Sequence, residues 1–489
     1  MAALPPPHVV VVGAGLAGLA AAEALVRTDR PGAAGRRVTL VEPAGRVGGV
    51  VATTRRDGWV VERSADSFLA ARPEAVDLAE RLGLADEFVG VDPAVRRALV
   101  FYGGRTHPVP AGFRLLAPGR IGSLLTTSLL SPAARLRVLA ERFVPARSAA
   151  VEDESLESFA VRRLGREAFE RLVQPLAAGI WTADPARLSM AAACGDFFAM
   201  ERRDGSLWAG EVRRGRRSGA EGTAAGARYG QFLTLAAGME TLPLRLSARL
   251  DELGVARLHA AATAVAPRPD GGWTVGLAPA RSGDAAAVPV AIDADAVILA
   301  TPAGAAAAAI RGCDAALADE LAAIEYAGSA IVSLGFRRDD VAHPLDAAGM
   351  VVPRVAGRRL LAVSFTSRKF PHRAPPGGVL MRSFVGGALD PAAMELDDET
   401  LVNLVRRELG DMLGVRGTPL VVQVDRWRGA MPQYTVGHAR RVARIDRLVA
   451  AHAGLAVAGA AYEGVGIPQV IGSGQTAAAR VAAALAPRG

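Results

Sequence analysis

The chain has 489 residues, of which 51% are hydrophobic, 5% aromatic and 22% charged. This length is too great for one core, and the apolar fraction is too high for a disordered chain, so two or three globular lobes are expected. The formal net charge is +8, and the basic residues are spread along the chain without a motif in which basic and aromatic residues alternate. This pattern argues against a nucleic-acid partner and suits an anionic substrate or a membrane surface at least as well.

The cysteines and the N-terminal residues indicate the compartment. The two cysteines, Cys194 and Cys313, have neither the spacing of a metal site nor that of a disulfide framework, which indicates a reducing environment. Residues 1–8 carry three prolines and no basic segment, unlike a secretory signal. The longest apolar run, Val9 to Val26, contains three glycines and Glu23, so a strand followed by a helix explains it better than a membrane span. We expect a cytoplasmic protein that contacts a membrane peripherally, if at all.

The first predicted unit is a strand, a glycine turn, a helix and a second strand. Val9 to Val12 is a short β-branched run, as expected of a strand buried in a parallel sheet. A G-x-G-x-x-G pattern follows, whose glycines allow the turn, the approach of a pyrophosphate and close helix packing. Its residues are Gly13, Ala14, Gly15, Leu16, Ala17 and Gly18. The phosphate is expected on the amides at the helix N-terminus, and Glu42, after the second strand, is expected to accept hydrogen bonds from a ribose.

The segment after Glu42 narrows the ligand from a dinucleotide to a flavin. It reads E-P-A-G-R-V-G-G and includes Arg46, Gly48 and Gly49. This segment resembles the second phosphate-side motif of the FAD-dependent amine oxidase and protoporphyrinogen oxidase superfamily. The paired glycines provide a close backbone approach and Arg46 provides charge, while Val50 stands where family members usually carry a basic residue.

Residues 57–69 make the resemblance narrower. They read D-G-W-V-V-E-R-S-A-D-S-F-L and look like the porphyrinogen oxidase version of this loop, with Ser64 in place of a commoner glycine. Arg72 and Pro73 then open a predicted helix that Gly83 ends. The resemblance implies that Arg72 binds a propionate carboxylate of the substrate.

The middle of the chain is predicted to be a small helical domain, preceded by a hairpin from Leu99 to Pro110. Residues 172–189, L-V-Q-P-L-A-A-G-I-W-T-A-D-P-A-R-L-S, are similar to the family signature G-I-Y-A-G-D-x-x-x-L-S. We expect Gly179 to lie against the flat face of the substrate, because only a residue without Cβ lets a planar ring approach the backbone. The alternative is a glycine that merely ends a helix.

Residues 204–227 are rich in Arg and Gly and are interpreted as a flexible loop. Regular secondary structure is expected again after this loop. A helix from Thr241 and strands up to Ala300 would then complete the flavin domain. The resemblance implies that the backbone around Val265 lies beside the adenine and that Ala300 follows a buried strand.

The next lobe is predicted to contain an antiparallel sheet and a helix from Asp398 to Leu413. The resemblance places Val351 and Phe384 at the walls of the porphyrinogen pocket, although both could be ordinary core residues. Other basic residues could lie at the rim, but the sequence does not show where they point. These are Arg354, Arg368 and Lys369.

The C-terminal part carries a second family pattern, P-Q-Y followed by G-H, at residues 432–438. A last buried strand ends at Gly459, and a glycine-rich turn then opens a helix. The amides of Val465, Gly466 and Ile467 are expected at the N-terminus of this helix, facing the flavin edge that becomes negative on reduction. His438 and His343 are interpreted as structural histidines.

These features together predict an α/β protein of three parts. A discontinuous Rossmann-like FAD-binding domain comprises residues 1–70, 228–302 and 441–489. An antiparallel-sheet substrate domain comprises residues 71–92 and 303–440. Residues 93–203 form a small helical domain that is also the candidate for membrane contact.

The resemblance covers essentially the full chain and implies FAD-dependent oxidation of a porphyrinogen in haem biosynthesis, with O2 as acceptor and release of H2O2. Protoporphyrinogen IX is favoured over coproporphyrinogen III, because only one arginine is predicted at the pocket. No catalytic side chain and no metal are predicted, and a monomer and a homodimer both remain open. The alternatives are another flavin amine oxidase or desaturase and a non-catalytic FAD-containing binding protein.

Overall fold

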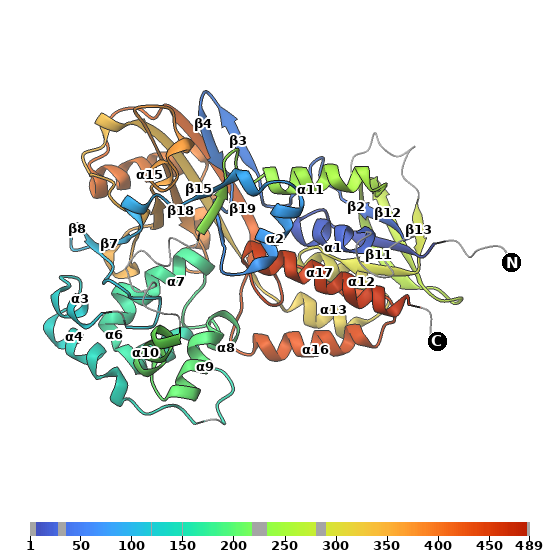
Figure 1. Cartoon of the computed structure of the whole chain (residues 1–489), viewed down its shortest axis with the longest axis horizontal. Coiled ribbons are helices and arrows are strands. Elements are labelled where there is room, and N and C mark those ends of the chain that lie inside the picture. The colour runs from blue at the N-terminus through green and yellow to red at the C-terminus, as the bar shows by residue number, and fades with distance from the viewer. Residues whose placement is uncertain are drawn as a thin grey trace.

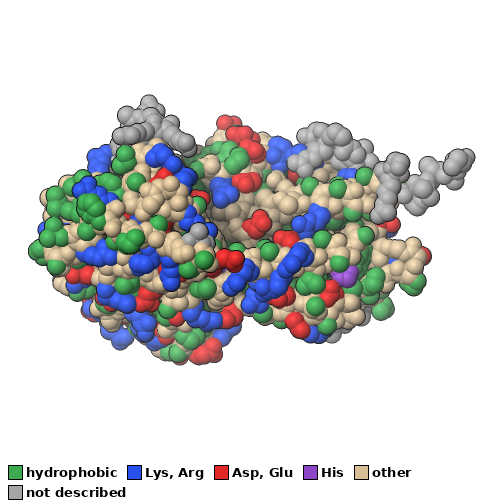
Figure 2. Space-filling view, turned by 90° about the horizontal axis from the view of Figure 1, so that it is seen from below, with side chains coloured by type: hydrophobic (Ala, Val, Ile, Leu, Met, Phe, Trp, Pro, Cys, Tyr) green, Lys and Arg blue, Asp and Glu red, His purple; other side chains and the backbone are tan. Residues whose placement is uncertain are grey.

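The computed structural model describes residues 6–27, 36–118, 120–148, 150–217, 232–279 and 290–486. Figure 1 shows two lobes side by side, one built on a parallel sheet and one on a mixed sheet, with a group of helices below the latter. In the space-filling view, the surface is hollowed near its middle, and Lys and Arg side chains are scattered over the face shown (Figure 2).

Five parallel strands form the centre of the first lobe, in the order β10-β2-β1-β14-β20. Their bounds are β10 Ala256–Leu258, β2 Arg37–Val41, β1 His8–Val12, β14 Ala296–Leu299 and β20 Leu455–Val457. β1 pairs with β2 on one side and with β14 on the other. Ligands of such sheets bind at the carboxyl ends of the strands where the connections diverge, which is here the end of β1 and β14.

Helices and a second layer of strands cover the two faces of this sheet, which is why its strands are continuous apolar runs. One face packs against α1 Leu16–Val26, α2 Pro73–Arg81, α11 Thr241–Glu252 and α17 Ile467–Ala484. The other face packs against β11 Ala260–Pro267, β12 Trp273–Pro279, α12 Ala303–Ile310, α13 Ala315–Ala322 and α16 His438–Ala450. β13 Ala291–Ala294 pairs with β12.

A seven-stranded sheet forms the second lobe, in the order β19-β15-β18-β17-β16-β7-β8. Its strands are β19 Val421–Pro432, β15 Tyr326–Arg337, β18 Gly378–Gly386, β17 Leu360–Ser364, β16 Gly349–Val351, β7 Ala98–Tyr102 and β8 Arg105–Pro108. Helix α15 Asp398–Leu413 packs on one face, where alternate residues such as Val332, Leu334 and Met381 are buried. The opposite face is therefore the one available to the other parts of the molecule.

The helices between β8 and β9 share a separate apolar core. They are α3 Ile121–Thr126, α4 Pro132–Leu139, α5 Leu156–Leu164, α6 Arg166–Ala168, α7 Gln174–Trp181, α8 Met190–Ala193, α9 Gly195–Asp204 and α10 Leu207–Arg217, with a 3₁₀-helix at Ala140–Phe143 and a π-helix at Phe169–Val173. Arg163 is fully buried in this helical lobe and pairs with Glu141 and Glu201.

Short elements join the lobes. β3 Thr53–Arg56 pairs with β4 Trp59–Glu62, and β9 Phe232–Leu235 pairs with both β5 Phe68–Leu69 and β6 Phe88–Gly90. Helix α14 Thr366–Lys369 follows β17. The remaining 3₁₀ turns are Ala85–Glu87, Pro93–Val95, Arg338–Asp340, Arg354–Ala356, Pro371–Arg373 and Pro391–Glu395.

Three predicted domain assignments are wrong in the structure. The hairpin β7-β8 belongs to the seven-stranded sheet, because β7 pairs with β16 in parallel and buries Leu99 and Phe101 in the core of that sheet. Helix α2 packs on the parallel sheet through its apolar face. The alanine-rich helix α12 and its neighbour α13 also pack on the parallel sheet, because alanines allow a close approach.

The predicted loop 204–227 is also wrong in its first part, where α10 forms. The amides of Leu207 and Trp208 at the start of this helix donate to the buried carboxylate of Glu141, at 3.0 Å and 3.2 Å. A carboxylate at a helix N-terminus satisfies amides that have no partner within the helix. Residues 218–227 lie outside the described residues.

Candidate active site

The glycine turn after β1 lies at the carboxyl end of the parallel sheet, as predicted. Gly13 has φ +103°, and a Cβ there would lie 2.6 Å from the carbonyl oxygen of Ala300, while a Cβ on Gly18 would lie 1.8 Å from that of Gly13. A Cβ on Gly15 would meet only the Cα of Gly49, at 4.0 Å. Gly13 and Gly18 are therefore required by the fold itself, whereas the backbone at Gly15 faces open space into which a ligand can approach.

The second glycine pair lies against this turn. The amide of Gly48 donates to the carbonyl of Ala14 at 2.8 Å, which brings the two phosphate-side motifs together. Arg46 is exposed, and its guanidinium donates to the carbonyls of Gly49 and, at 3.4 Å, of Val51. Arg46 thus holds its own turn in the structure, next to the predicted pyrophosphate position.

Glu42 reaches back over the glycine turn from the end of β2. Its carboxylate accepts the amides of Ala14 at 2.7 Å and Ala44 at 2.8 Å. Leu16 and Ala17 begin α1, and no side chain caps this helix at Gly15. The uncapped helix amides and the neighbouring carboxylate fit a pyrophosphate and a ribose, respectively.

Val265 is not brought to this end of the sheet. It is buried in β11, where it pairs with Val275, five residues or about 16 Å along the strand from Ala260. Leu258 and Ala260 lie beside Glu42: the carbonyl of Leu258 accepts the amide of Glu42 at 3.0 Å, and the amide of Ala260 donates to the carbonyl of Glu42 at 3.2 Å. Leu258 was missed because β10 is only three residues long, and its position after a predicted helix was the available signal.

The C-terminal turn completes the same edge of the sheet. Gly459 follows β20 with φ +132°, and no atom lies within 4 Å of the position of a Cβ. Gly466 is the N-cap of α17, no side chain caps this helix, and Ile467 is its first residue. Val465 packs on the core of the helical lobe, so the N-terminus of α17 lies between two lobes.

Two buried hydroxyls near this edge have no partner among the described residues. They are Oγ1 of Thr301, which lies beside Gly13, and the hydroxyl of Tyr462. Burial raises the pKa of Tyr462, so its hydroxyl stays protonated. Unpartnered buried polar atoms, two uncapped helix N-termini and the open backbone at Gly15 and Gly459 fit a dinucleotide cofactor such as FAD.

The P-Q-Y and G-H pattern supports the turn after β20. The hydroxyl of Tyr434 donates to the carbonyl of Ala460 at 2.6 Å, and Nε2 of His438 lies 3.1 Å from the carbonyl of Tyr462. Burial lowers the pKa of His438, which keeps the ring neutral. His438 therefore has a structural role in holding the cofactor-side turn, and His343 likewise bonds Thr106 and the amide of Leu345.

The two signature segments, residues 172–189 and 431–438, contact each other directly. The amide of Ser189 donates to the carbonyl of Tyr434 at 2.7 Å, and that of Val436 donates to the carbonyl of Arg187 at 2.9 Å. The helical lobe is therefore fixed to the turn that carries Gly459.

Gly179, Val351 and Phe384 come together on the free face of the seven-stranded sheet. Val351 pairs with Ala362, and Ala362 pairs with Phe384, so these three lie in one row across β16, β17 and β18. A Cβ on Gly179 would lie 3.7 Å from Val351 and 4.0 Å from Ala362. The backbone of α7 thus packs within contact distance of an apolar row of the sheet, and the substrate slot is predicted beside this contact, along Phe384.

Arg72 is exposed and lies at the start of α2, and its side chain makes no hydrogen bond or ion pair with any residue that the structure describes. Its role in binding a propionate stays a prediction.

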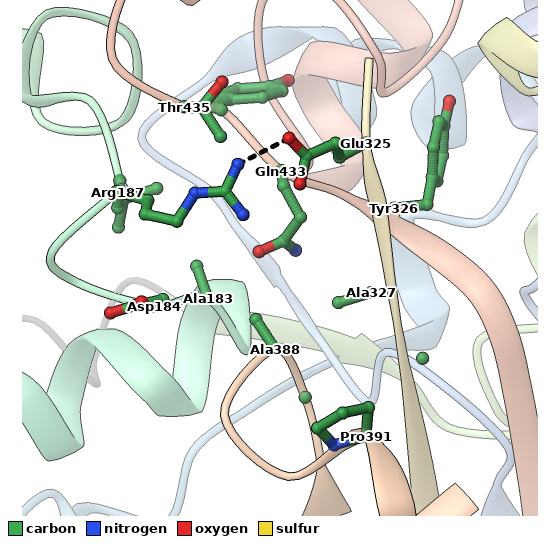
Figure 3. A pocket seen from close by; sticks show the side chains of 14 residues that line it. Ala183, Asp184, Arg187, Glu325, Tyr326, Ala327, Ala388, Pro391, Gln433 and Thr435 are labelled. Atoms are coloured by element: carbon green, nitrogen blue, oxygen red, sulfur yellow. Dashed lines mark hydrogen bonds and ion pairs between the residues drawn. The ribbon is translucent and has the colours of Figure 1, made fainter. Parts of the chain in front are cut away.

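A cavity of about 250 Å³ lies where the two signature segments meet β15. Arg187 and Glu325 pair across it at 2.5 Å, and Tyr326 and Gln433 lie on its wall (Figure 3). The amide of Ala303 donates to the hydroxyl of Tyr326 at 2.9 Å. This volume is below the usual range for a ligand site, so we do not assign the substrate to it.

The loop after β4 carries charged residues to the seven-stranded sheet. Asp66 pairs with Lys369 and Arg382, and Glu62 pairs with Arg373. Burial alone would raise the pKa of Asp66, but the two cations hold it well below its usual range. Burial raises the pKa of Glu62, against the attraction of Arg373.

Within the described residues, no three or more His, Cys, Asp and Glu side chains are grouped so that they could hold a metal ion. The search of the same residues also finds no helix of the length and hydropathy needed to cross a membrane.

Comparisons with known proteins agree with this geometry. Residues 16–482 match the family described as flavin-containing amine oxidoreductase. Coproporphyrinogen III oxidase of Bacillus subtilis is 32% identical, over 96% of this chain and 97% of that protein. Protoporphyrinogen oxidase 1 of Arabidopsis thaliana is 28% identical, over 88% of this chain and 79% of that protein.

We also compared the fold with solved structures. The crystal structure of an Exiguobacterium protein whose name includes protoporphyrinogen oxidase has a TM-score of 0.83 and 28% identity. The match covers 98% of this chain and 99% of that one. The predicted superfamily, the mixed α/β fold and the flavin cofactor are thus confirmed. The chain belongs to the flavin-containing amine oxidoreductase family.

Proposed function

We propose that this chain oxidises coproporphyrinogen III to the porphyrin, with FAD as its cofactor and O2 as the final electron acceptor. The observation that carries the proposal is the apolar row of Val351 and Phe384 on the free face of the sheet, with the bare backbone of Gly179 packed beside it. A flat macrocycle can lie against this apolar sheet face, beside the Gly179 backbone. The relatives from Bacillus subtilis and Arabidopsis, which cover 96% and 88% of this chain, are named as porphyrinogen oxidases.

The reaction removes six hydrogens from the macrocycle in three two-electron steps, and three O2 are reduced to three H2O2. FAD, when bound, supplies the acceptor for two electrons in each step. The N-terminus of α1 would hold the phosphates of FAD, and the amides at Val465, Gly466 and Ile467 would favour negative charge at the flavin edge that they face. The slot excludes water from the ring, and shifts of double bonds within the macrocycle bring later hydrogens to the same place, so no side chain has to act as a base.

The choice of coproporphyrinogen III departs from the expectation stated for the sequence. That expectation depended on Arg72 as the one basic residue at the pocket. The Bacillus subtilis enzyme shares more sequence with this chain than the Arabidopsis enzyme does, and it is named for the substrate with four propionates. Basic side chains whose direction the sequence does not show also lie beside the slot.

The test is a comparison of substrates with the purified flavoprotein. Porphyrin fluorescence and peroxide release are measured with coproporphyrinogen III, protoporphyrinogen IX, an aliphatic amine and a carotenoid precursor. We expect the highest kcat/KM with coproporphyrinogen III. A preference for protoporphyrinogen IX would reverse the substrate choice. Turnover of the amine or the carotenoid precursor alone would indicate another enzyme of the family. No turnover of any substrate would indicate a binding protein.

A further inference from the structure

Five charged side chains, three buried and two partly buried, lie where β4 and the loop after it meet the seven-stranded sheet, and we call them the crossing cluster. They are Glu62, Asp66, Lys369, Arg373 and Arg382. Two carboxylates face three cations, which leaves one positive charge in excess. An uncompensated charge away from water is costly, so the cluster is incomplete as it stands.

The excess positive charge is found around Asp66. Its Oδ1 is 2.9 Å from Nζ of Lys369 and its Oδ2 is 3.3 Å from Nη1 of Arg382, so one carboxylate is shared by two cations. Glu62 and Arg373 form a separate pair at 2.8 Å. The pair of Arg63, on the same loop, and Asp425, on β19, is 2.6 Å apart, is neutral and does not change the balance.

The hydrogen-bond donors show the same excess. Nε of Arg382 is buried without a partner, and so are Nε and Nη1 of Arg373. Arg382 is 1% exposed and Arg373 is 0% exposed, so water does not supply the missing acceptors from the open surface. A surplus of both charge and donors indicates that an anionic acceptor belongs to this cluster.

The cluster adjoins the slot on the same face of the sheet. Arg382 pairs across the strands with Ser364, in the row next to the row of Ala362 and Phe384. Residues two apart on a strand point to the same face, and the Arg382 guanidinium lies 5.5 Å from the centre of the Phe384 ring. The side chains of Asp66 and Lys369 are each 12% exposed, more than the arginines, so the cluster is least buried at this pair.

We propose that the crossing cluster binds a propionate carboxylate of the substrate, with Lys369 as the residue that determines specificity for a tetracarboxylate. This inference rests on the proposed function. A macrocycle that lies against Phe384 has its rim near Arg382, and a carboxylate there neutralises the excess charge. Coproporphyrinogen III has two more propionates than protoporphyrinogen IX, so it gains more from a cation at this position.

The first experiment measures KM and kcat of the holoenzyme with Lys369→Met, which leaves two carboxylates and two arginines in balance. We expect KM for coproporphyrinogen III to rise roughly 10- to 100-fold, the cost of one charge-assisted hydrogen bond, with a smaller rise for protoporphyrinogen IX. Lys369→Arg should restore most of the affinity. Arg368→Met is the matched control, because Nε of Arg368 bonds the carbonyl of Leu345 and not the cluster.

The second experiment needs no turnover. Binding of coproporphyrin III and of its tetramethyl ester is measured by quenching of porphyrin fluorescence. Lys369→Met should weaken binding of the acid and leave binding of the ester unchanged. The unfolding temperature and the FAD content of Lys369→Met show whether this variant has a folding defect. If it has one, Lys369→Gln is used in its place.

Two results would overturn the inference. If Lys369→Met binds the acid as well as wild type does and has a lowered flavin midpoint potential, the Lys369 charge stabilises the reduced flavin instead. Equal losses for acid and ester would show a role in shape alone. Failure of the proposed function is seen separately, as a wild-type flavoprotein that neither oxidises a porphyrinogen nor binds either porphyrin, and it would remove this inference as well.

Discussion

The ring of Tyr434 stacks on the imidazole of His438, with centroids 4.1 Å apart and planes 13° apart. Each ring also bonds a backbone carbonyl in the turn after β20, at Ala460 and Tyr462. Two side chains of one motif thus hold the backbone next to Gly459, so the effect of changing them should be seen in cofactor binding.

Tyr434→Phe should keep the stacking and lose the 2.6 Å hydrogen bond to Ala460. We expect a loss of about 1 kcal/mol in the free energy of unfolding and faster release of FAD, because the turn is less firmly held. Urea unfolding and flavin fluorescence measure the two effects. Tyr102→Phe is the control, because Tyr102 lies on β7, away from the turn. FAD release as slow as in wild type would contradict the role assigned to the hydroxyl.

Gly15→Val and Gly18→Ala should fail in different ways. A side chain at Gly15 has space in the protein but lies where the pyrophosphate approaches, so the variant should fold and remain colourless. The Cβ of an alanine at position 18 would lie 1.8 Å from the carbonyl oxygen of Gly13, so that variant should itself be unstable. Absorbance at the flavin bands and thermal unfolding separate the two cases. A fully yellow Gly15→Val protein would refute the assignment of the cofactor site.

Gly179→Leu should block the slot without affecting FAD. A Cβ is 3.7 Å from Val351, which is ordinary contact, so Gly179→Ala should be mild, whereas the larger side chain must enter the slot. We expect a rise in KM of at least about tenfold or loss of turnover, with flavin content unchanged, from the overlap of leucine with the ring. Parallel loss of flavin and activity would instead assign Gly179 to folding.

Acid should destabilise the protein between pH 6.5 and about 4. Burial, followed by repulsion from Arg373, lowers the pKa of His372 to about 4, and burial also lowers the pKa of His8, His107 and His438. The unfolded chain therefore binds more protons in this range, and stability falls as the pH drops from 6.5 through the folded pKa values. His372→Gln should flatten this dependence, as measured by urea midpoints at several pH values. An unchanged slope would exclude His372 as a contributor.

The predicted membrane contact can be tested at an apolar patch on the helical lobe. Ile121, Leu125, Leu136 and Phe143 are exposed there, and Phe143 is 72% exposed. If these side chains enter a bilayer, Leu136→Ser with Phe143→Ser should reduce sedimentation with anionic vesicles more than tenfold, since each buried apolar side chain contributes about 1.5–3 kcal/mol. Val422→Ser with Leu420→Ser, at exposed residues near the start of β19, is the control. Equal binding of all three proteins would exclude the patch.

The local parts of the fold could be predicted because neighbouring residues determine them. The strand Arg37–Val41, the helix Asp398–Leu413 and the hairpin around Gly103 occur where the sequence indicates. The parallel pairing of β7 with β16 could not be predicted, because the strands are about 250 residues apart and nothing local distinguishes this partner. Helix α10 likewise depends on a buried carboxylate from another segment.

The candidate site shows the same division. The glycine motifs could be recognised by their spacing. Gly179, Val351 and Phe384 lie near one another, and their role in binding the substrate stays a prediction. Val265 was assigned to the adenine by the resemblance, but it lies five residues along β11 from Ala260, away from the end of β2. Lys369 could be noticed in the sequence, but only the fold brings it to Asp66, which is about 300 residues earlier.

The parallel sheet takes its strands from segments that are far apart in the chain, and β20 and α17 follow all the others. During synthesis, the glycine turn at residues 13–18 exists long before Gly459 and the amides of α17. A ribosome-bound chain that lacks this late segment can thus offer the flavin only the part of the site around the glycine turn. Cofactor loading is coupled to the docking of this late segment, so flavin availability in the cell should influence how much of the chain completes folding.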